Sequence, residues 1–357
     1  MKFACIEFAF WLAALLLQSP PGKDEPWPAD MPPRAKVSTP ADHARPDEPP
    51  LSTYEGVPVK RVDVRYPDGS LRRRSYTREN GRRLPVDHGP DVRWHENKEI
   101  QLRRIWINGK QNGLFQEWWE NGFQKSEGPF VEDEKQGTWI NWHENGVPAN
   151  ERTYEHGLPE GRAREWFENR LQKSESTWRK GKEHGLSRLW FINGKPRSET
   201  TYVEGVLEGP SREWTNEGAL KQEGSYARGR EQGPWKRTDP DGTRTEENYA
   251  AGLLEGAKTV WDAKGTKRSA GSYLSGKAIG LHTSWSESGK LYQEIEYADG
   301  QPQGPWRQYF ESGALEIEGT MKSGKREGEW RYHRPDGSLD PQWSGVYQDD
   351  KKIKDLP

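Results

Sequence analysis

Histidine and cysteine are the side chains most able to bind a metal or act as a nucleophile, and both are sparse here. His95 and His143 occupy equivalent places in a 24-residue repeat, two repeats apart. If each repeat adds two strands about 4.8 Å apart, these imidazoles lie roughly 19 Å from one another, too far to share one zinc ion. Cys5 is the sole cysteine. We find no Ser-His-Asp motif and no glycine loop before a helix, so we predict no catalytic residue, no metal site and no cofactor.

Glutamates form a regular row, which we number by taking the first glycine of each repeat as position 0. Position 14 is occupied by Glu127, Glu151, Glu175, Glu199, Glu223, Glu294 and Glu318. A spacing of about 10 Å in a stacked sheet is too wide for a carboxylate pair or a cation cage. Arg164, Arg188 and Arg212 at position 3 are candidate cross-strand partners. The row is therefore interpreted as a solvated, ion-paired face, with a docking strip for a cationic partner as the alternative.

Aromatic residues recur with the same period. Position 5 is Trp94, Trp118, Trp142, Trp166, Trp190, Trp214, Trp261, Trp285 and Tyr309. We interpret this row as core, with a ligand or carbohydrate platform as the alternative. Trp119 and Phe167 directly follow two members of the row. Because neighbours along a strand point to opposite faces, both are predicted on the face opposite the row, where exposed aromatics often mark interfaces. They form our first candidate binding surface.

A basic cluster is the second candidate surface. Arg72, Arg73 and Arg74 lie near the N-terminal end of the repeats, together with Arg82-Arg83 and Arg103-Arg104. Such a cluster could contact an anionic membrane surface.

These residues must be positioned by the repeat itself. The position-0 glycines are 24 residues apart, with a single 23-residue interval, at 89, 113, 137, 161, 185, 209, 233, 256, 280, 304 and 328. Asn-Gly and Asp-Gly pairs at positions 8 and 9 predict type I′ hairpin turns between short strands rich in aromatic residues. A hairpin alone is marginally stable in water, so neighbouring hairpins must pair edge to edge.

The repeat Gly209-Pro-Ser-Arg-Glu-Trp214-Thr-Asn-Glu-Gly218 resembles a MORN repeat, and is more closely similar to the bacterial MORN-repeat variants described as antitoxin-like. The resemblance covers about residues 60–347. It implies an all-β fold, an elongated single-layer antiparallel sheet of tandem 24-residue β-hairpins without an active site. It also implies binding of protein or lipid. An antitoxin role in a toxin-antitoxin system is carried as an alternative.

The remaining sequence predicts the organisation of the ends. Residues 1–18 have the form of a signal peptide or N-terminal anchor, and 19–52 are predicted to be a Pro-rich disordered linker. Residues 53–88 are predicted to be a degenerate repeat, 89–347 the tandem repeats and 348–357 a charged tail. The protein is thus expected to be secreted or associated with the periplasm or envelope, and cytoplasmic if the first segment is not an export signal.

Composition narrows the function. Lys and Arg total 54 against 56 Asp and Glu, giving a net charge of -2, which argues against a nucleic-acid partner. We expect a non-enzymatic repeat scaffold that binds another protein. Binding of envelope lipid or polysaccharide is the further alternative.

Overall fold

The computed structural model describes residues 27–38, 50–81 and 84–356, and these contain strands and turns but no helix. The predicted export segment 1–18 and the pair Arg82-Arg83 lie outside the described residues. The chain divides into two compact units. The first unit runs to Leu158 and adds Arg162–Glu175 and Trp190–Lys195; the second holds Pro159–Gly161, Ser176–Leu189 and Pro196–Pro357.

Strands of the first unit pair antiparallel with their neighbours in the chain, and β3 pairs only with β4 among the described strands, which makes it an edge. Its strands are β1 (Thr53–Tyr54), β2 (Val57–Pro58), β3 (Lys60–Arg65), β4 (Leu71–Arg78), β5 (Val86–Asp87), β6 (Gly89–Trp94), β7 (Ile100–Ile107), β8 (Lys110–Gln111), β9 (Gly113–Trp118), β10 (Gln124–Val131), β11 (Glu134–Lys135), β12 (Gly137–Trp142) and β13 (Pro148–Glu155). The short pair β1–β2 is a separate two-stranded sheet.

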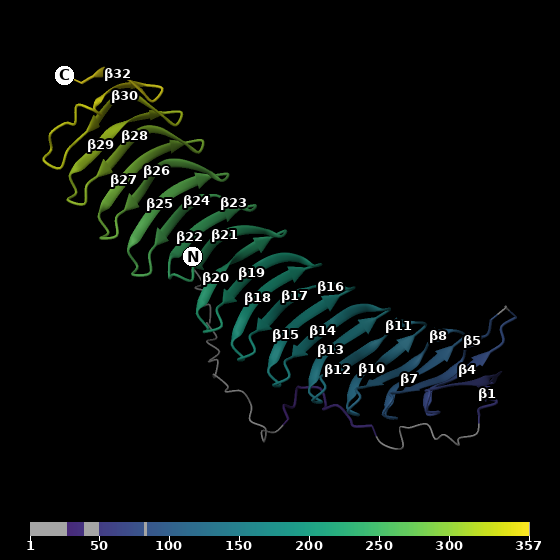
Figure 1. Ribbon diagram of the computed structural model, residues 1–357. Helices are drawn as coiled ribbons and strands as arrows, with labels where there is room; N and C mark the ends of the chain where they lie inside the picture. The colour runs from purple at the N-terminus through teal and green to yellow at the C-terminus, as the bar shows by residue number, and fades with distance from the viewer. Residues whose placement is uncertain (1–26, 39–49, 82–83, 357) are drawn as a thin grey trace, which may run out of the picture. The chain divides into compact units, whose positions relative to one another are not determined.

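The second unit repeats this plan (Figure 1), and β32 pairs only with β31 among the described strands, which leaves a second open edge. Its strands are β16 (Lys182–Glu183), β18 (Pro196–Val203), β19 (Val206–Trp214), β20 (Leu220–Ala227), β21 (Arg230–Thr238), β22 (Arg244–Ala250), β23 (Leu253–Leu254), β24 (Gly256–Trp261), β25 (Lys267–Leu274), β26 (Lys277–Trp285), β27 (Leu291–Ala298), β28 (Gln301–Tyr309), β29 (Leu315–Lys322), β30 (Lys325–Tyr332), β31 (Gly345–Gln348) and β32 (Lys351–Asp355). Residues of β14 (Leu158–Trp166), β15 (Gln172–Arg179) and β17 (Gly185–Trp190) are divided between the two units. The all-β hairpin architecture is as predicted.

The two turns of each repeat differ from the prediction. A type I′ turn needs positive φ at both central residues, but at Asn121-Gly122 only the glycine has one, 84°. There, Gly122 N donates to the Trp119 carbonyl and Trp119 N donates to the Phe123 carbonyl, which is a type I turn followed by a left-handed glycine. Paired positive φ values occur instead at the opposite end of the hairpin, for example 49° at His156 and 75° at Gly157. Type I′ turns therefore occur at the turns that join one hairpin to the next, and not at the Asn-Gly pairs for which they were predicted.

The two sheet faces carry different rows of rings. Position 5 lies on one face, which we call the Trp-row face; Trp94, Trp118, Trp142 and Trp166 there are 4–5 % exposed. On the opposite face, rings at position 2 pack over glycines at position 15 of the preceding repeat. A Cβ placed on Gly128, Gly224 or Gly319 would lie 2.1–2.3 Å from the tryptophan it faces. These glycines are required by close packing, because none of the three has a positive φ.

The glutamate row is ion-paired. Arg164 Nη2 lies 2.7 Å from Glu151, and Arg188 Nε lies 3.1 Å from Glu199. Glu223 lies 3.6 Å from both Arg212 and Lys236. Cross-strand ion pairs thus account for these members of the row, as the first interpretation predicted, whereas Glu127 accepts hydrogen bonds from Gln116 and Gln124 instead.

Residues 27–38 contact the first unit, which differs from the disordered linker predicted for 19–52. Ser38 N donates to the Gly122 carbonyl and Ala35 N to the Gly146 carbonyl. Trp142 Nε1 donates to the Pro33 carbonyl over 2.8 Å. We call residues 27–38 the strap; in Figure 1 it is the purple segment at the turn ends of β10 and β12. The segment is ordered because its prolines favour an extended conformation, and in this conformation its backbone groups form hydrogen bonds with the turns of the sheet.

The C-terminal end also differs from its prediction. Residues 348–357 were expected to be a charged tail, but β31 and β32 form a hairpin there. Asp349 and Asp350 form its turn, with φ of 49° and 70°. Asp350 Oδ1 accepts from Arg326 Nε at 3.3 Å, and this pair anchors the turn. The polar sequence therefore completes the sheet.

Candidate binding groove

Side chains at one turn edge connect each repeat of the first unit to the next. Trp119 Nε1 at position 6 donates to the Trp142 carbonyl over 3.1 Å. The side-chain amide of Asn121 at position 8 donates to the Glu144 carbonyl over 2.8 Å, and that of Asn145 donates to the Glu168 carbonyl over 3.1 Å. These hydrogen bonds fix the turns relative to one another and so set the spacing of the side chains that the turns carry.

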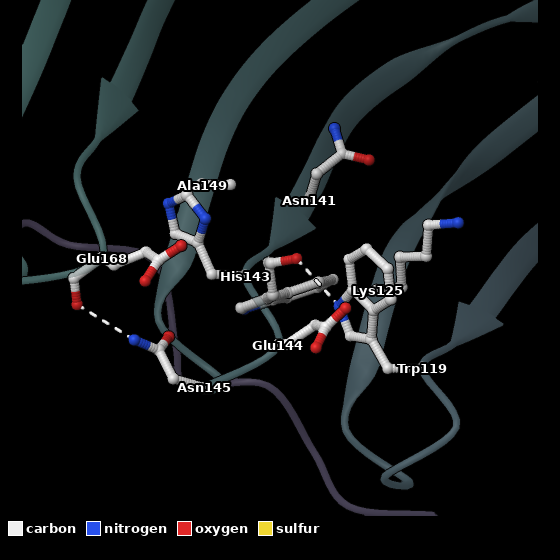
Figure 2. A pocket seen from close by; sticks show the side chains of 9 residues that line it. Trp119, Lys125, Asn141, His143, Glu144, Asn145, Ala149 and Glu168 are labelled. Atoms are coloured by element: carbon white, nitrogen blue, oxygen red, sulfur yellow. Dashed lines mark hydrogen bonds between the residues drawn. The ribbon is translucent and has the colours of Figure 1, made fainter.

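An open hollow of about 670 Å³ lies along this edge (Figure 2). It is lined by Trp119, Lys125, Asn141, Trp142, His143, Glu144, Asn145, Ala149 and Glu168. His143 Nε2 is 3.0 Å from the Trp166 carbonyl oxygen, so the imidazole is held by a backbone acceptor as Trp119 is. The floor is therefore rigid, because its rings are bonded to backbone.

Carboxylates surround this floor. Glu144 and Glu168 are exposed, and neither carboxylate forms an ion pair with any residue that the structure describes. Lys125 is the cation of the hollow: its Nζ is 4.7 Å from the centre of the Trp119 ring and 3.0 Å from Glu117. The lysine charge is thus already paired, and the exposed rim is acidic.

A second hollow of about 430 Å³ continues the first and shares Trp119, Lys125 and Glu144 with it. It adds Glu120, which is 83 % exposed and lies 3.9 Å from His95 Nδ1. We call the two hollows together the turn-edge groove. Its charges repeat once per hairpin, about 10 Å apart.

The structure places the predicted aromatic pair differently. Trp119 lines both hollows of the turn-edge groove, but so do members of the Trp row, with Trp142 in the first hollow and Trp118 in the second. Phe167 occupies the equivalent turn position two repeats later and is half-buried, with its N–H bonded to the Leu171 carbonyl. It does not line either hollow.

The predicted basic cluster is largely occupied by ion pairs. Arg74 is 4 % exposed and its Nε lies 3.0 Å from Asp63. Arg73 Nε lies 2.8 Å from the buried Asp91. Arg72 alone of the three is exposed, with its guanidinium 5.8 Å from the centre of the Tyr66 ring. The cluster is therefore chiefly structural, since carboxylates neutralise its two inner members.

Asp91 is the most strongly engaged of these carboxylates. It also accepts from Arg104 Nε at 2.9 Å and from Trp106 Nε1 at 3.2 Å. Burial alone would raise the pKa of Asp91, but the hydrogen bond and charge of Arg73, with the other donors, hold it below its usual value. The group is a stabilising anion within the sheet.

Sequence reasoning missed the acidic rim. Position 7 is glutamate in four successive repeats, at Glu96, Glu120, Glu144 and Glu168. The 24-residue spacing made this row visible, but without knowledge of the turn its exposure could not be distinguished from that of the ion-paired row at position 14.

No group of three or more His, Cys, Asp or Glu in the described ranges is arranged to hold a metal. Within the same residues, we find no helix of the length and apolarity that crossing a membrane requires.

Comparison with known families agrees with the repeat geometry. Residues 135–156, 279–299 and 302–323 match the family described as MORN repeat variant. The chain contains MORN-variant repeats. The first matched segment includes Asn141–Asn145 and Ala149, so the turn-edge groove is built on a MORN repeat and its neighbours.

Other comparisons add little. A search of curated proteins gave no significant match. A crystal structure of TcdB2-TccC3 without its hypervariable C-terminal region aligns with 79 % of this chain at 11 % identity and a TM-score of 0.15. The chain spans 18 % of that protein's length, and a likeness at this level supports no conclusion.

Proposed function

We propose that this protein is a non-enzymatic scaffold whose turn-edge groove binds a basic segment of another protein. MORN repeats are consistent with a scaffold role of this kind. The observation that carries the proposal is that the exposed carboxylates of Glu144 and Glu168, which form no ion pair with a described residue, lie beside the fixed ring of Trp119. A Lys or Arg side chain can pair with a carboxylate and lie on an indole at once.

The spacing of the rim suggests how such a segment lies. Carboxylates recur about every 10 Å, two strand spacings, and an extended chain covers that distance in about three residues. A segment with a basic residue at every third position would therefore place one cation near each of Glu120, Glu144 and Glu168. The Asn-bonded turns keep the carboxylates at this period, which lowers the entropy lost on binding.

A titration tests the proposal directly. The probe is the synthetic peptide (Lys-Ser-Pro)₄, added to the full chain and followed by calorimetry. We expect saturable binding that weakens as salt rises, because exposed charges are screened. The double variant Glu144→Gln, Glu168→Gln should weaken binding about three- to tenfold, the effect of two exposed ion pairs.

The matched control uses the second unit. Glu287 holds position 7 there, but position 6 before it is Ser286 and offers no ring. Glu287→Gln should leave the affinity unchanged. Equal weakening by Glu287→Gln, or no weakening by the double variant, would show that the peptide binds by net charge and not in the groove.

Export is a separate proposal that rests on residues 1–18 alone. We propose a secreted or envelope-associated location, tested by fractionating cells that produce the full chain. A soluble cytoplasmic protein would instead favour the antitoxin-like alternative. Binding of anionic lipid is less favoured, because Arg73 and Arg74 are held by Asp91 and Asp63.

A further inference from the structure

The strap shows how the Trp-row face of the first unit holds an extended chain. Pro32 and Ala35 are buried and Ser38 is half-buried, whereas Pro33, Arg34, Lys36 and Val37 are exposed. Met31 is buried as well, and from Pro32 onward one inward residue occurs in every three. Ser38 and Ala35 bond to Gly122 and Gly146, the same position in successive repeats. Three residues of strap therefore span one 24-residue repeat.

This register has a simple physical basis. A polyproline-type chain rises about 3.1 Å per residue and turns once in three residues, so it presents the same face about every 9.3 Å. Two strand spacings amount to about 9.6 Å. An extended proline-containing segment therefore stays in phase with the hairpins and can place one small side chain beside each tryptophan.

The second unit has a similar row of rings and glycines, and no described segment covers it as the strap covers the first unit. Trp261, Trp285 and Tyr309 hold position 5 in three successive repeats, and each is half-buried rather than buried. Gly265 and Gly289 hold position 9, where the first unit has its strap acceptors. We call this the second-unit groove.

Two kinds of polar group in this groove lack the partners that the strap supplies in the first unit. Trp142 Nε1 donates to the strap, but the indole N–H groups of Trp261 and Trp285 have no acceptor within the described ranges. The carbonyls of Gly265 and Gly289 likewise accept no hydrogen bond from the residues described. Donors and acceptors thus recur at the period of an extended chain.

The charged side chains of the second-unit groove indicate that its ligand carries negative charge. The Arg244 guanidinium lies 4.5 Å from the centre of the Trp261 ring, and Lys267 Nζ lies 5.3 Å from that of Trp285. Neither cation forms a salt bridge with a described residue. These flexible side chains can swing off the rings and meet carboxylates on an incoming chain.

We infer that the second-unit groove binds an extended, proline-containing, acidic segment of a partner protein, in a register of three residues per repeat. The ligand resembles the strap in backbone and in its small inward residues, and differs in carrying carboxylates outward. This site differs from the turn-edge groove because it lies in the second unit and binds an acidic rather than a basic segment.

The test uses a peptide derived from the strap sequence. The probe is Trp-Pro-Ala-Asp-Met-Pro-Pro-Glu-Ala-Glu-Val-Ser, which is residues 27–38 with the two exposed cations replaced by glutamate. Calorimetry on the full chain should show saturable binding to one site. Trp285→Phe keeps a ring but removes the N–H, and should weaken binding about two- to tenfold, the effect of one hydrogen bond.

Controls separate this site from the first unit. Trp94→Phe, at the same repeat position but away from the strap contacts, should leave the affinity unchanged. Hydrogen exchange of residues 27–38 should not change on peptide addition. Absence of saturable binding, insensitivity to Trp285→Phe, or faster exchange in the strap would each overturn the inference. The (Lys-Ser-Pro)₄ titration is independent, so either proposal can fail alone.

Discussion

Gly224→Ala is predicted to disrupt the second unit because Trp235 occupies the space that a Cβ needs. The added carbon would lie 2.1 Å from Trp235 Cδ2 and 2.3 Å from Cε2. Ordinary contacts begin near 3.4 Å, so the ring must move by about 1.3 Å. Trp235 is 1 % exposed, bonds through Nε1 to the Ser225 carbonyl and packs edge-on against Tyr226. The ring therefore has no free direction in which to move.

The cost follows from these contacts. Overpacking costs about 1–3 kcal/mol, the hydrogen bond about 1 kcal/mol, and the edge-to-face contact about 0.5–1.5 kcal/mol. We therefore expect the local free energy of unfolding to fall by about 2.5–5.5 kcal/mol, measured by hydrogen exchange of the amides in β20 and β21. Exchange is the suitable assay because a repeat array can open locally.

A control and a double-mutant cycle distinguish ring contact from backbone strain. Gly265 has φ of +82° and open space where a Cβ would lie, so Gly265→Ala should cost only about 1–2 kcal/mol. In the Trp235→Ala background, Gly224→Ala should cost almost nothing. If Gly224→Ala is neutral in the wild-type background, or equally costly in both, the packing argument is refuted.

Two further predictions concern the first unit. Because the pKa of Asp91 is lower in the native state than in the unfolded state, its contribution to stability is fully present above about pH 4, the unfolded value, and is lost as pH falls through the native pKa. Asp91→Asn should lower the free energy of unfolding by about 3–5 kcal/mol at pH 7 and flatten the loss of stability at acid pH in urea melts. An unchanged acid dependence would count against the assignment. Trp142→Phe removes the donor to Pro33, so exchange in residues 27–38 should become about two- to tenfold faster while β18–β32 stay unchanged; an unchanged strap would contradict its anchoring.

The fold was largely predictable because the glycines recur at a constant spacing. The period gave the hairpins. Alternation predicted Trp118 and Trp119 on opposite faces, but both side chains line the second hollow at the turn edge. The turn types were not predictable from the dipeptide alone. Asn121 favours type I′ in isolation, but its side chain bonds to the next repeat, which stabilises the type I form.

The strap was not predictable from composition. Residues 27–38 carry too few apolar side chains to form a core, and proline normally indicates a spacer. This segment is ordered because three residues of extended chain have the same length as one 24-residue repeat of the sheet. That match can be recognised only when the conformation of the segment and the spacing of the strands are both known. Its main bonds are between backbone groups, which the sequence does not encode directly.

The candidate site was predicted in part. Trp119 was singled out as an exposed ring beside a buried one, and it lines the groove. Phe167 satisfied the same rule but lies outside the hollows. Arg73 and Arg74 appeared to be free cations because their partners Asp91 and Asp63 are distant in sequence; cross-strand register brings them together.

Hydrogen exchange of the full chain with and without (Lys-Ser-Pro)₄ tests the central claim most directly. The turn-edge groove predicts slower exchange confined to the turns at 119–123 and 143–147, lost at high salt and in the Glu144→Gln, Glu168→Gln variant. Protection spread evenly over the repeats, or centred on β4 and its arginines, would contradict it.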